Sequence, residues 1–166
     1  IGGVGKTTLL KRINNFMEGL GYEIVIFMVV SENGSIEGIQ KDMMIRLGMK
    51  VENTTYLQRE GIIRRCLNDK KFVLLLDDIW KEWDLEEVGV PIHGNNKNYK
   101  IIFTTRSRSV CDQVQAKRIK IECLNNEEAW ELFKTTVGET ILNSTIEIKR
   151  IGEQVAQECG GLPLAL

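Results

Sequence analysis

The sequence predicts an α/β fold, a parallel β-sheet with helices on both faces, and three observations lead to this class. Short β-branched, apolar segments alternate with segments of helical periodicity over residues 1–122. The apolar segments are apolar throughout rather than at every second position, which is typical of strands buried on both faces of a parallel sheet. Past residue 122 the pattern changes to helices alone, so we expect a small helical part to begin near Leu124.

The elements of the first half follow from periodicity and capping residues. The first expected helix follows a glycine-rich segment, where apolar residues recur at helical spacing: Leu9, Ile13, Phe16 and Leu20. Residues 22–30 are expected to form a strand, because the apolar run stops at a polar cluster over residues 31–35. Two amphipathic helices follow. Ser35 can cap the first, and Thr55 and Gln58 fit a capping box at the start of the second.

The second half is expected to supply three strands and then three helices. The strands are expected at residues 72–76, 100–104 and 118–122. The helices are expected at residues 126–137, 144–159 with Ser144 and Glu147 as a capping box, and from Leu162 onward. In a parallel sheet of this kind, ligands bind at the carboxyl ends of the strands.

Composition and charge exclude several classes of protein. The 166 residues carry 22 Lys and Arg against 23 Asp and Glu, a net charge of -1, so no nucleic-acid or membrane surface is indicated. The longest apolar run, Ile24 to Val30, is far shorter than the roughly 20 residues of a transmembrane helix. The four cysteines are scattered singly and His93 is the only histidine, which favours reduced thiols in a cytoplasmic protein over a zinc site.

The segment from Gly2 to Thr8 matches the second half of the phosphate-binding loop G-x-x-x-x-G-K-[ST]. Its glycines let the backbone wrap around a phosphate, and the helix that follows directs its positive end at the anion. Lys6 is expected to reach the β- and γ-phosphates, and the Thr7 hydroxyl to bind Mg²⁺. The alternative is a glycine-rich turn that only starts a helix. The candidate cofactor-binding residues of this segment are Gly3, Val4, Gly5, Lys6, Thr7 and Thr8.

The strand over residues 72–76 ends in Asp77 and Asp78. A carboxylate at the tip of a buried strand beside a phosphate loop suits Mg²⁺, so Asp77 is the candidate metal ligand. Asp78 lies one residue further and is the candidate catalytic residue, which would orient or deprotonate an attacking water. The alternative for Asp78 is a solvated acidic turn that leads into Ile79 and Trp80.

Two further segments suggest contacts with a nucleotide. The strand that starts at Lys100 ends in Thr104, Thr105 and Arg106, and this arginine can bind a γ-phosphate and so distinguish a triphosphate from a diphosphate. A surface arginine at the end of a strand is the alternative. Residues 160–166 break one helix and start another, with Pro163 at a position suited to a first helical turn.

Taken together, these segments resemble the NB-ARC domain of plant nucleotide-binding, leucine-rich-repeat disease-resistance proteins. Five motifs match in the family's order. They are the phosphate loop (residues 2–8), the Walker B segment (74–80), the sensor strand (102–106) and two later signatures (128–133 and 161–164). Trp80 resembles the coiled-coil class of these proteins rather than the Toll/interleukin-receptor class.

The resemblance implies a P-loop NTPase fold of the STAND/AAA-like type. It divides the chain into a nucleotide-binding domain at residues 1–123, without its first strand, and a truncated helical ARC subdomain at residues 124–166. It also implies that Pro163 lies against the adenine and ribose. These are statements about the family, and the residues alone show only a helix-to-helix corner at Pro163.

The function implied by the resemblance is an ADP/ATP-binding molecular switch of an intracellular plant immune receptor. ADP would hold the off state, ATP with Mg²⁺ the on state, and slow hydrolysis would reset it, so the domain would be a weak ATPase with a regulatory purpose. The implied location is cytoplasmic. The implied partners are the leucine-rich-repeat and N-terminal coiled-coil domains of the same chain, with oligomerisation on activation left open and no nucleic acid.

Two other functions remain as alternatives. An ordinary turnover enzyme, either a GTPase or a kinase, is one, but the guanine signature Asn-Lys-x-Asp is not completed by Asn96-Lys97-Asn98-Tyr99, which favours adenine. A nucleotide-free interaction module is the other. The presence of all four polar site residues speaks against that module: Lys6, Thr7, Asp77 and Arg106.

The sequence starts inside the phosphate loop, so we expect the strand that feeds Ile1 to be missing. By the resemblance, that strand lies between the sensor strand and the strand expected at residues 118–122. Both would then have backbone groups that face an empty position, and buried unpaired groups cost about 1–3 kcal/mol each. We therefore expect residues 1–166 alone to be aggregation-prone or molten.

Overall fold

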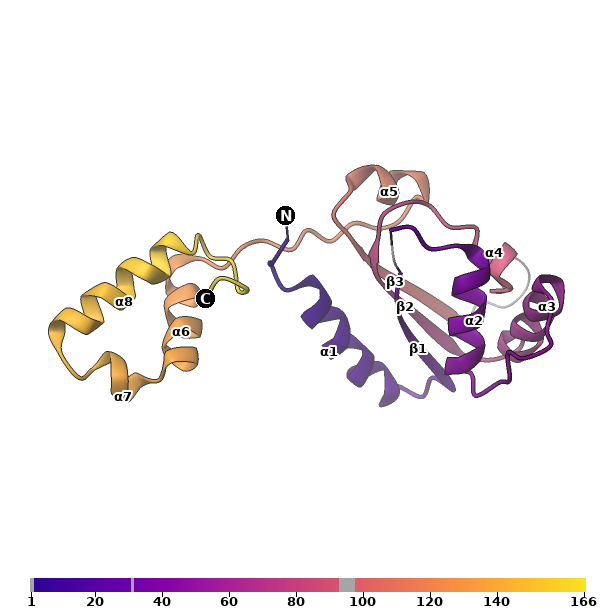
Figure 1. Cartoon of the computed structure of the whole chain (residues 1–166), viewed down its shortest axis with the longest axis horizontal. Helices are drawn as coiled ribbons and strands as arrows, with labels where there is room; N and C mark the ends of the chain where they lie inside the picture. The colour runs from indigo at the N-terminus through magenta and orange to yellow at the C-terminus, as the bar shows by residue number, and fades with distance from the viewer. Residues whose placement is uncertain (1, 31, 93–97) are drawn as a thin grey trace. The chain divides into compact units, whose positions relative to one another are not determined.

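The computed structural model of the chain describes residues 2–30, 32–92 and 98–166 (Figure 1). The chain forms two compact units. We call Thr7–Arg118 the sheet unit, and Ile1–Lys6 together with Ile119–Leu166 the helical unit. The expected domain boundary near residue 124 stays a prediction, because compact units are not by themselves functional domains.

The sheet unit is built on a three-stranded parallel sheet in the order β1-β2-β3. The strands are β1 (Ile24–Val29), β2 (Phe72–Ile79) and β3 (Tyr99–Thr105). In the central strand β2 every residue except Asp78 is buried, which is the pattern that its uninterrupted apolar sequence predicts. The expected α/β class is confirmed, and three of the four expected strands are present.

Helices cover both faces of the sheet (Figure 1). On one face α1 (Lys6–Glu18) packs Leu10 against Val73 and Leu75 of β2. Alternate residues of the strands point to the other face, where they form the larger core with the remaining helices. These helices are α2 (Ile36–Arg46), α3 (Tyr56–Leu67), α4 (Leu85–Val88) and α5 (Arg108–Gln113).

Capping residues begin α2 and α3 as the sequence predicts. The Ser35 hydroxyl accepts a hydrogen bond from the Gly38 N–H at 3.0 Å. Thr55 and Gln58 form a reciprocal capping box, with bonds of 3.3 Å and 2.8 Å between each side chain and the other residue's N–H. Each cap satisfies N–H groups that a helix leaves unpaired at its start.

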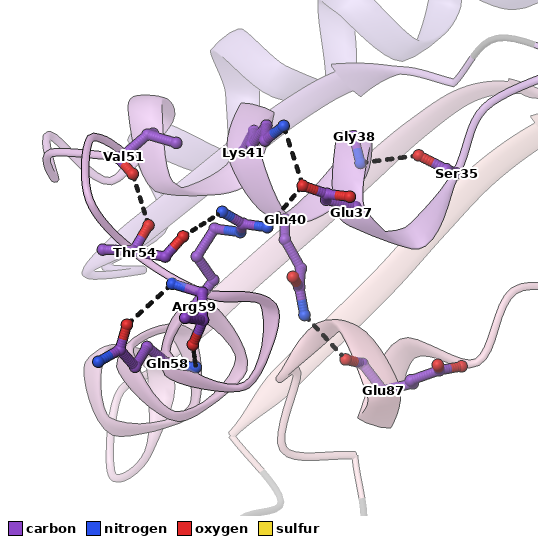
Figure 2. Close-up of polar contacts among 11 residues, drawn as sticks. Ser35, Glu37, Gly38, Gln40, Lys41, Val51, Thr54, Gln58, Arg59 and Glu87 are labelled. Carbon is purple, nitrogen blue, oxygen red and sulfur yellow. Dashed lines mark hydrogen bonds and ion pairs between the residues drawn. The ribbon is translucent and has the colours of Figure 1, made fainter.

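A buried arginine connects α2 to α3 (Figure 2). Arg59 is only 4% exposed; its Nη2 donates to Glu37 Oε1 at 2.9 Å and its Nη1 to the carbonyl oxygen of Thr54 at 2.7 Å. Glu37 also accepts from Lys41 at 3.0 Å, and this bond, with the charges of Lys41 and Arg59, lowers the pKa of Glu37. The buried guanidinium therefore has a charged partner, as burial requires.

The short helix α4 packs closely against its neighbours. The fully buried Gln40 of α2 donates from Nε2 to the carbonyl oxygen of Glu87 at 3.1 Å (Figure 2). Gly89 ends α4 at a φ of +109°, and a Cβ there would lie 2.5 Å from the carbonyl oxygen of Glu60. Glycine is required at this position by both its backbone conformation and the proximity of α3.

The helical unit contains α6 (Asn126–Val137), α7 (Glu139–Leu142) and α8 (Ile146–Glu158). Gly152 lets α8 approach its neighbours, because a Cβ there would lie 2.8 Å from a methyl carbon of Leu142. The expected capping box of Ser144 and Glu147 is wrong by one residue. Thr145 caps α8, while the Ser144 hydroxyl donates to the carbonyl oxygen of Ile141 at 2.7 Å. In the described ranges, no helix is long and apolar enough to cross a membrane.

Two expected elements are wrong. Residues 118–122 form no strand, and Ile119 is 77% exposed. A strand needs a hydrogen-bonded neighbour, and none of the described strands pairs with this segment. The helix expected from Leu162 is only a turn, closed by bonds from Ala165 and Leu166 to the Leu162 carbonyl oxygen at 2.9 Å and 3.3 Å.

Candidate functional site

The predicted site residues are distributed over both units. Gly3, Val4, Gly5, Lys6 and Pro163 belong to the helical unit, and Thr7, Thr8, Asp77, Asp78 and Arg106 belong to the sheet unit. Within the sheet unit, the structure brings Asp77, Asp78 and Arg106 together; within the helical unit, it brings Gly3 to the segment that carries Pro163. Their roles towards a ligand stay predictions. Asn96 and Lys97, used in the guanine comparison, lie outside the described residues, as does His93.

Two glycines determine the path of the phosphate-loop segment. Gly3 has a φ of +80° and Gly5 a φ of +92°, in the left-handed region that side chains rarely adopt. Helix α1 then begins at Lys6, and Thr7 and Thr8 lie in its first turn, which contains no acidic residue. A glycine-rich bend that leads into a helix N-terminus suits a phosphate group.

The Gly-Leu-Pro-Leu segment, residues 161–164, contacts the phosphate-loop segment. The Leu164 N–H donates to the Gly3 carbonyl oxygen at 3.2 Å, and a Cβ on Gly3 would lie 3.2 Å from the Cβ of Leu164. Gly161, at a φ of +70°, is held by a 2.8 Å bond from the Leu124 N–H to its carbonyl oxygen, and any side chain there would collide with the Leu124 backbone. Pro163 is thereby one residue from a direct contact with the phosphate loop.

The end of β2 is irregular, and Asp77 and Asp78 occupy the irregularity. β2 pairs Leu76 with Phe103 but Ile79 with Thr105, so β2 has one more residue than β3 over this stretch. Such a bulge changes the direction of side chains at the end of a strand. Asp78 takes a φ of +56°, which is unusual for a residue other than glycine. Asp77 is 3% exposed, whereas Asp78 is half-buried.

Thr104 of β3 contacts both aspartates. Its hydroxyl oxygen accepts a hydrogen bond from the Asp78 N–H at 2.8 Å, and its hydroxyl donates to Asp77 Oδ1 at 2.6 Å. Sequence reasoning missed this residue as a member of the site. A hydroxyl two residues before Arg106, at the end of the strand beside β2, is the signal that could have found it.

Arg106 pairs with Asp78. Its Nε lies 3.2 Å from Oδ1 and its Nη2 lies 3.4 Å from Oδ2, so the guanidinium binds both carboxylate oxygens. The same guanidinium lies 5.3 Å from the ring centre of Trp80, a cation–π contact. Sequence reasoning used Trp80 only as a marker of protein class, and the structure gives it a contact in the site.

The oxygen ligands available fit Mg²⁺ bound together with a nucleotide. Over the described residues, no group of three or more His, Cys, Asp or Glu side chains could hold a metal ion. The candidates are the buried Asp77 carboxylate and the Thr7 hydroxyl. Mg²⁺ prefers oxygen ligands and usually takes one or two from the protein and the rest from phosphates and water.

The chain is similar to known proteins over most of its length. The sequence model of the NB-ARC domain matches residues 1–143. In Arabidopsis thaliana, the Probable disease resistance protein At1g15890 is 47% identical over 100% of this chain and 20% of its own length. The Disease resistance proteins SUMM2 and UNI, from the same plant, are 46% and 43% identical over 100% of this chain and 19% of their lengths. The chain thus spans about a fifth of the length of the curated relatives it matches.

Proposed function

The chain belongs to the NB-ARC domain family of plant disease-resistance proteins, and we propose that it is a nucleotide switch with ADP in its off state and ATP with Mg²⁺ in its on state. The family supports a nucleotide-binding role in defence. The observation that carries the proposal is the phosphate-loop segment, in which two glycines of positive φ lead into α1 at Lys6.

The phosphate loop would bind the phosphates. In this proposal the N–H groups of Gly3, Val4, Gly5 and the first turn of α1, including Thr8, face the phosphate oxygens, and Lys6 adds its positive charge. The hydrogen bond between Leu164 and Gly3 supports the placement of Pro163 against the adenine and ribose, because it joins the Gly-Leu-Pro-Leu segment to the loop.

The end of the sheet would bind the cation and respond to the γ-phosphate. Asp77 and Thr7 would hold Mg²⁺ through oxygen atoms, and Mg²⁺ would neutralise charge on the phosphates. Arg106 would bind the γ-phosphate, and Asp78 would orient or deprotonate the attacking water. Hydrolysis would be slow, since a switch must remain in the ATP state long enough to signal.

The rest of the proposal concerns the complete protein. We infer a cytoplasmic location, with leucine-rich-repeat and N-terminal coiled-coil domains of the same chain as partners, and we leave oligomerisation on activation open. The relatives support further domains, because this chain covers about a fifth of their length. A nucleotide acts as a switch only if the two states differ in their affinity for it.

Calorimetry on the complete protein tests nucleotide binding. Wild type should bind ADP and ATP, and Lys6→Ala should bind them at least about tenfold more weakly, because a charged hydrogen bond contributes about 1.5–3 kcal/mol. Lys11→Ala is the matched control, since Lys11 is exposed on the same helix. Equal affinities for wild type and Lys6→Ala would exclude the proposed role of the phosphate loop.

A further inference from the structure

We infer that Thr104 is the positioning residue for the cation-binding carboxylate, and that its hydroxyl fixes Asp77 and Asp78 together. The inference rests on the proposed function, because it assigns to Thr104 a role towards the Mg²⁺ site at Asp77. The residues that carry it lie at or just after the ends of β1, β2 and β3, inside the sheet unit.

The direction of the two hydrogen bonds is determined by the groups involved. The Asp78 N–H can only donate, so the Thr104 oxygen is its acceptor at 2.8 Å. The single hydroxyl proton of Thr104 then points to Asp77 Oδ1 at 2.6 Å. The chain of bonds runs from a backbone amide through a hydroxyl to a carboxylate, an order in which each bond strengthens the next.

This arrangement fixes the orientation of the Asp77 carboxylate. The backbone of Asp77 is held from the opposite side, because the Val30 N–H donates to the Asp77 carbonyl oxygen at 3.0 Å. With the backbone bound to the β1 side and Oδ1 bound to β3, rotation of the carboxylate is restricted. The carboxylate is thus oriented before a cation binds, and this orientation determines which of its oxygens can bind the cation. Residues that orient metal ligands in this way strongly affect the affinity for the metal.

The same hydroxyl stabilises the unusual backbone at Asp78. The left-handed φ of +56° at Asp78 and the extra residue in β2 turn the Asp78 N–H towards β3, where Thr104 accepts it. Without this acceptor the amide would lose its hydrogen-bond partner in a half-buried position, which would destabilise this backbone conformation. Thr104 therefore connects the residue proposed to bind the cation with the residue proposed to act on water.

Threonine suits this role better than a more flexible hydroxyl residue. Two heavy atoms on its Cβ restrict χ1, so the hydroxyl keeps one direction on the strand. Valine has the same shape without the hydroxyl, which makes Thr104→Val a test of the two hydrogen bonds rather than of packing. Thr104→Ser keeps the hydroxyl and removes only a methyl group.

The test measures Mn²⁺ binding to the complete protein in the presence of ADP, by electron paramagnetic resonance. Loss of a residue that orients a metal ligand typically weakens metal affinity by about 10–100-fold, and we expect a loss of this size in Thr104→Val. Thr104→Ser should bind Mn²⁺ within about threefold of wild type, which is less than about 0.7 kcal/mol. ADP affinity in excess EDTA should be the same in all three proteins.

The control is Thr105→Val, on the same strand. Among the described residues, the Thr105 hydroxyl has only a local bond, from the Ser107 N–H at 3.0 Å, so its removal should leave Mn²⁺ affinity unchanged. In an Asp77→Asn background, Thr104→Val should have no further effect on Mn²⁺, because the side chain it orients is no longer a carboxylate. A purely structural role for Thr104 would still lower affinity in that background.

Wild-type affinity for Mn²⁺ in Thr104→Val, or equal losses in Thr104→Val and Thr105→Val, would overturn the inference. If the Thr104→Val variant does not fold, the Thr104→Ala variant replaces it in the test, because it also lacks the hydroxyl. The same outcomes then apply. If the proposed function itself is wrong, the result is different, because the wild-type protein then binds no ADP.

Discussion

The guanidinium of Arg106 holds both carboxylate oxygens of Asp78, at 3.2 Å and 3.4 Å. These are the two side chains proposed to act on the γ-phosphate side of a nucleotide. While they are paired, the N–H groups of Arg106 that point to Asp78 cannot donate to another group. Binding of a triphosphate through Arg106 should therefore exchange this ion pair for contacts with the γ-phosphate.

We predict that the Arg106→Ala variant discriminates poorly between ATP and ADP in its binding affinity. ATP affinity should fall by about tenfold or more, because a charged hydrogen bond is lost, while ADP affinity should stay within about threefold. Calorimetry with both nucleotides measures the ratio. Arg108→Ala is the control, since Arg108 is exposed at the start of α5. Equal losses for ATP and ADP would show that Arg106 does not respond to the γ-phosphate.

The two aspartates should separate by role. Asp77→Ala should abolish the Mg²⁺ dependence of ATP binding, because the buried carboxylate is the proposed metal ligand. Asp78→Ala should leave ATP binding intact and slow its hydrolysis. Titrations with and without Mg²⁺ measure the first effect, and single-turnover hydrolysis measures the second. An unchanged hydrolysis rate in Asp78→Ala would leave Asp78 as an acidic turn residue.

Arg59 should contribute to stability although it lies outside the proposed site. Arg59→Ala removes the bonds to Glu37 and the Thr54 carbonyl oxygen, and we expect a loss of roughly 1–3 kcal/mol in the free energy of unfolding. Arg65→Ala, on the exposed side of α3, should change it by less than about 0.5 kcal/mol. Denaturant unfolding of both variants gives the comparison, and similar values would contradict a structural role for the buried guanidinium.

Gly160, just before the Gly-Leu-Pro-Leu segment, and Gly161, its first residue, should respond differently to substitution by alanine. Gly160 has a φ of +59° and open space around its Cβ position, so Gly160→Ala should cost only about 1–2 kcal/mol of backbone strain. Gly161→Ala should cost more, because its Cβ also collides with the Leu124 carbonyl oxygen. Thermal unfolding and ADP affinity of the two variants test this. Equal effects would mean that the Leu124 contact adjusts without cost.

Residues 1–166 expressed alone should behave as an aggregation-prone or molten chain. Among the described strands, β3 pairs only with β2, so one of its edges is open to pairing with other chains. Amide spectra and the cooperativity of unfolding measure this property directly. A monomer with well-dispersed amide resonances and a cooperative transition would refute the expectation.

The sequence predicted the central strand and the helix starts well, because their signals are local. The apolar run from Phe72 to Leu76 needs burial on both faces wherever it lies, and Thr55 with Gln58 carries its own capping bonds. The apolar pattern of Leu9, Ile13, Phe16 and Leu20 did not identify the side of α1 that faces the sheet, because most of these residues are exposed. Leu10 packs on β2, whereas Phe16 is 65% exposed.

The candidate site was predictable only in part. Asp77, Asp78 and Arg106 end apolar strands, and parallel strands bring their carboxyl ends to one edge of the sheet. The role of Thr104 depends on a bulge that gives β2 one extra residue, and no short sequence pattern encodes this register shift. The pairing of Arg106 with Asp78 and Trp80 depends on the same shift, so it could be found only in three dimensions.

The hydrogen bond between Leu164 and Gly3 also constrains when the protein can mature. Its two partners lie near opposite ends of the chain, so the phosphate-loop segment leaves the ribosome long before the segment that packs against it. At about 5–20 residues per second, synthesis of the intervening residues takes roughly 8–30 s. Throughout that interval the Gly3 carbonyl oxygen lacks its native partner, so the phosphate-loop segment can complete its contacts only after the Gly-Leu-Pro-Leu segment has been made.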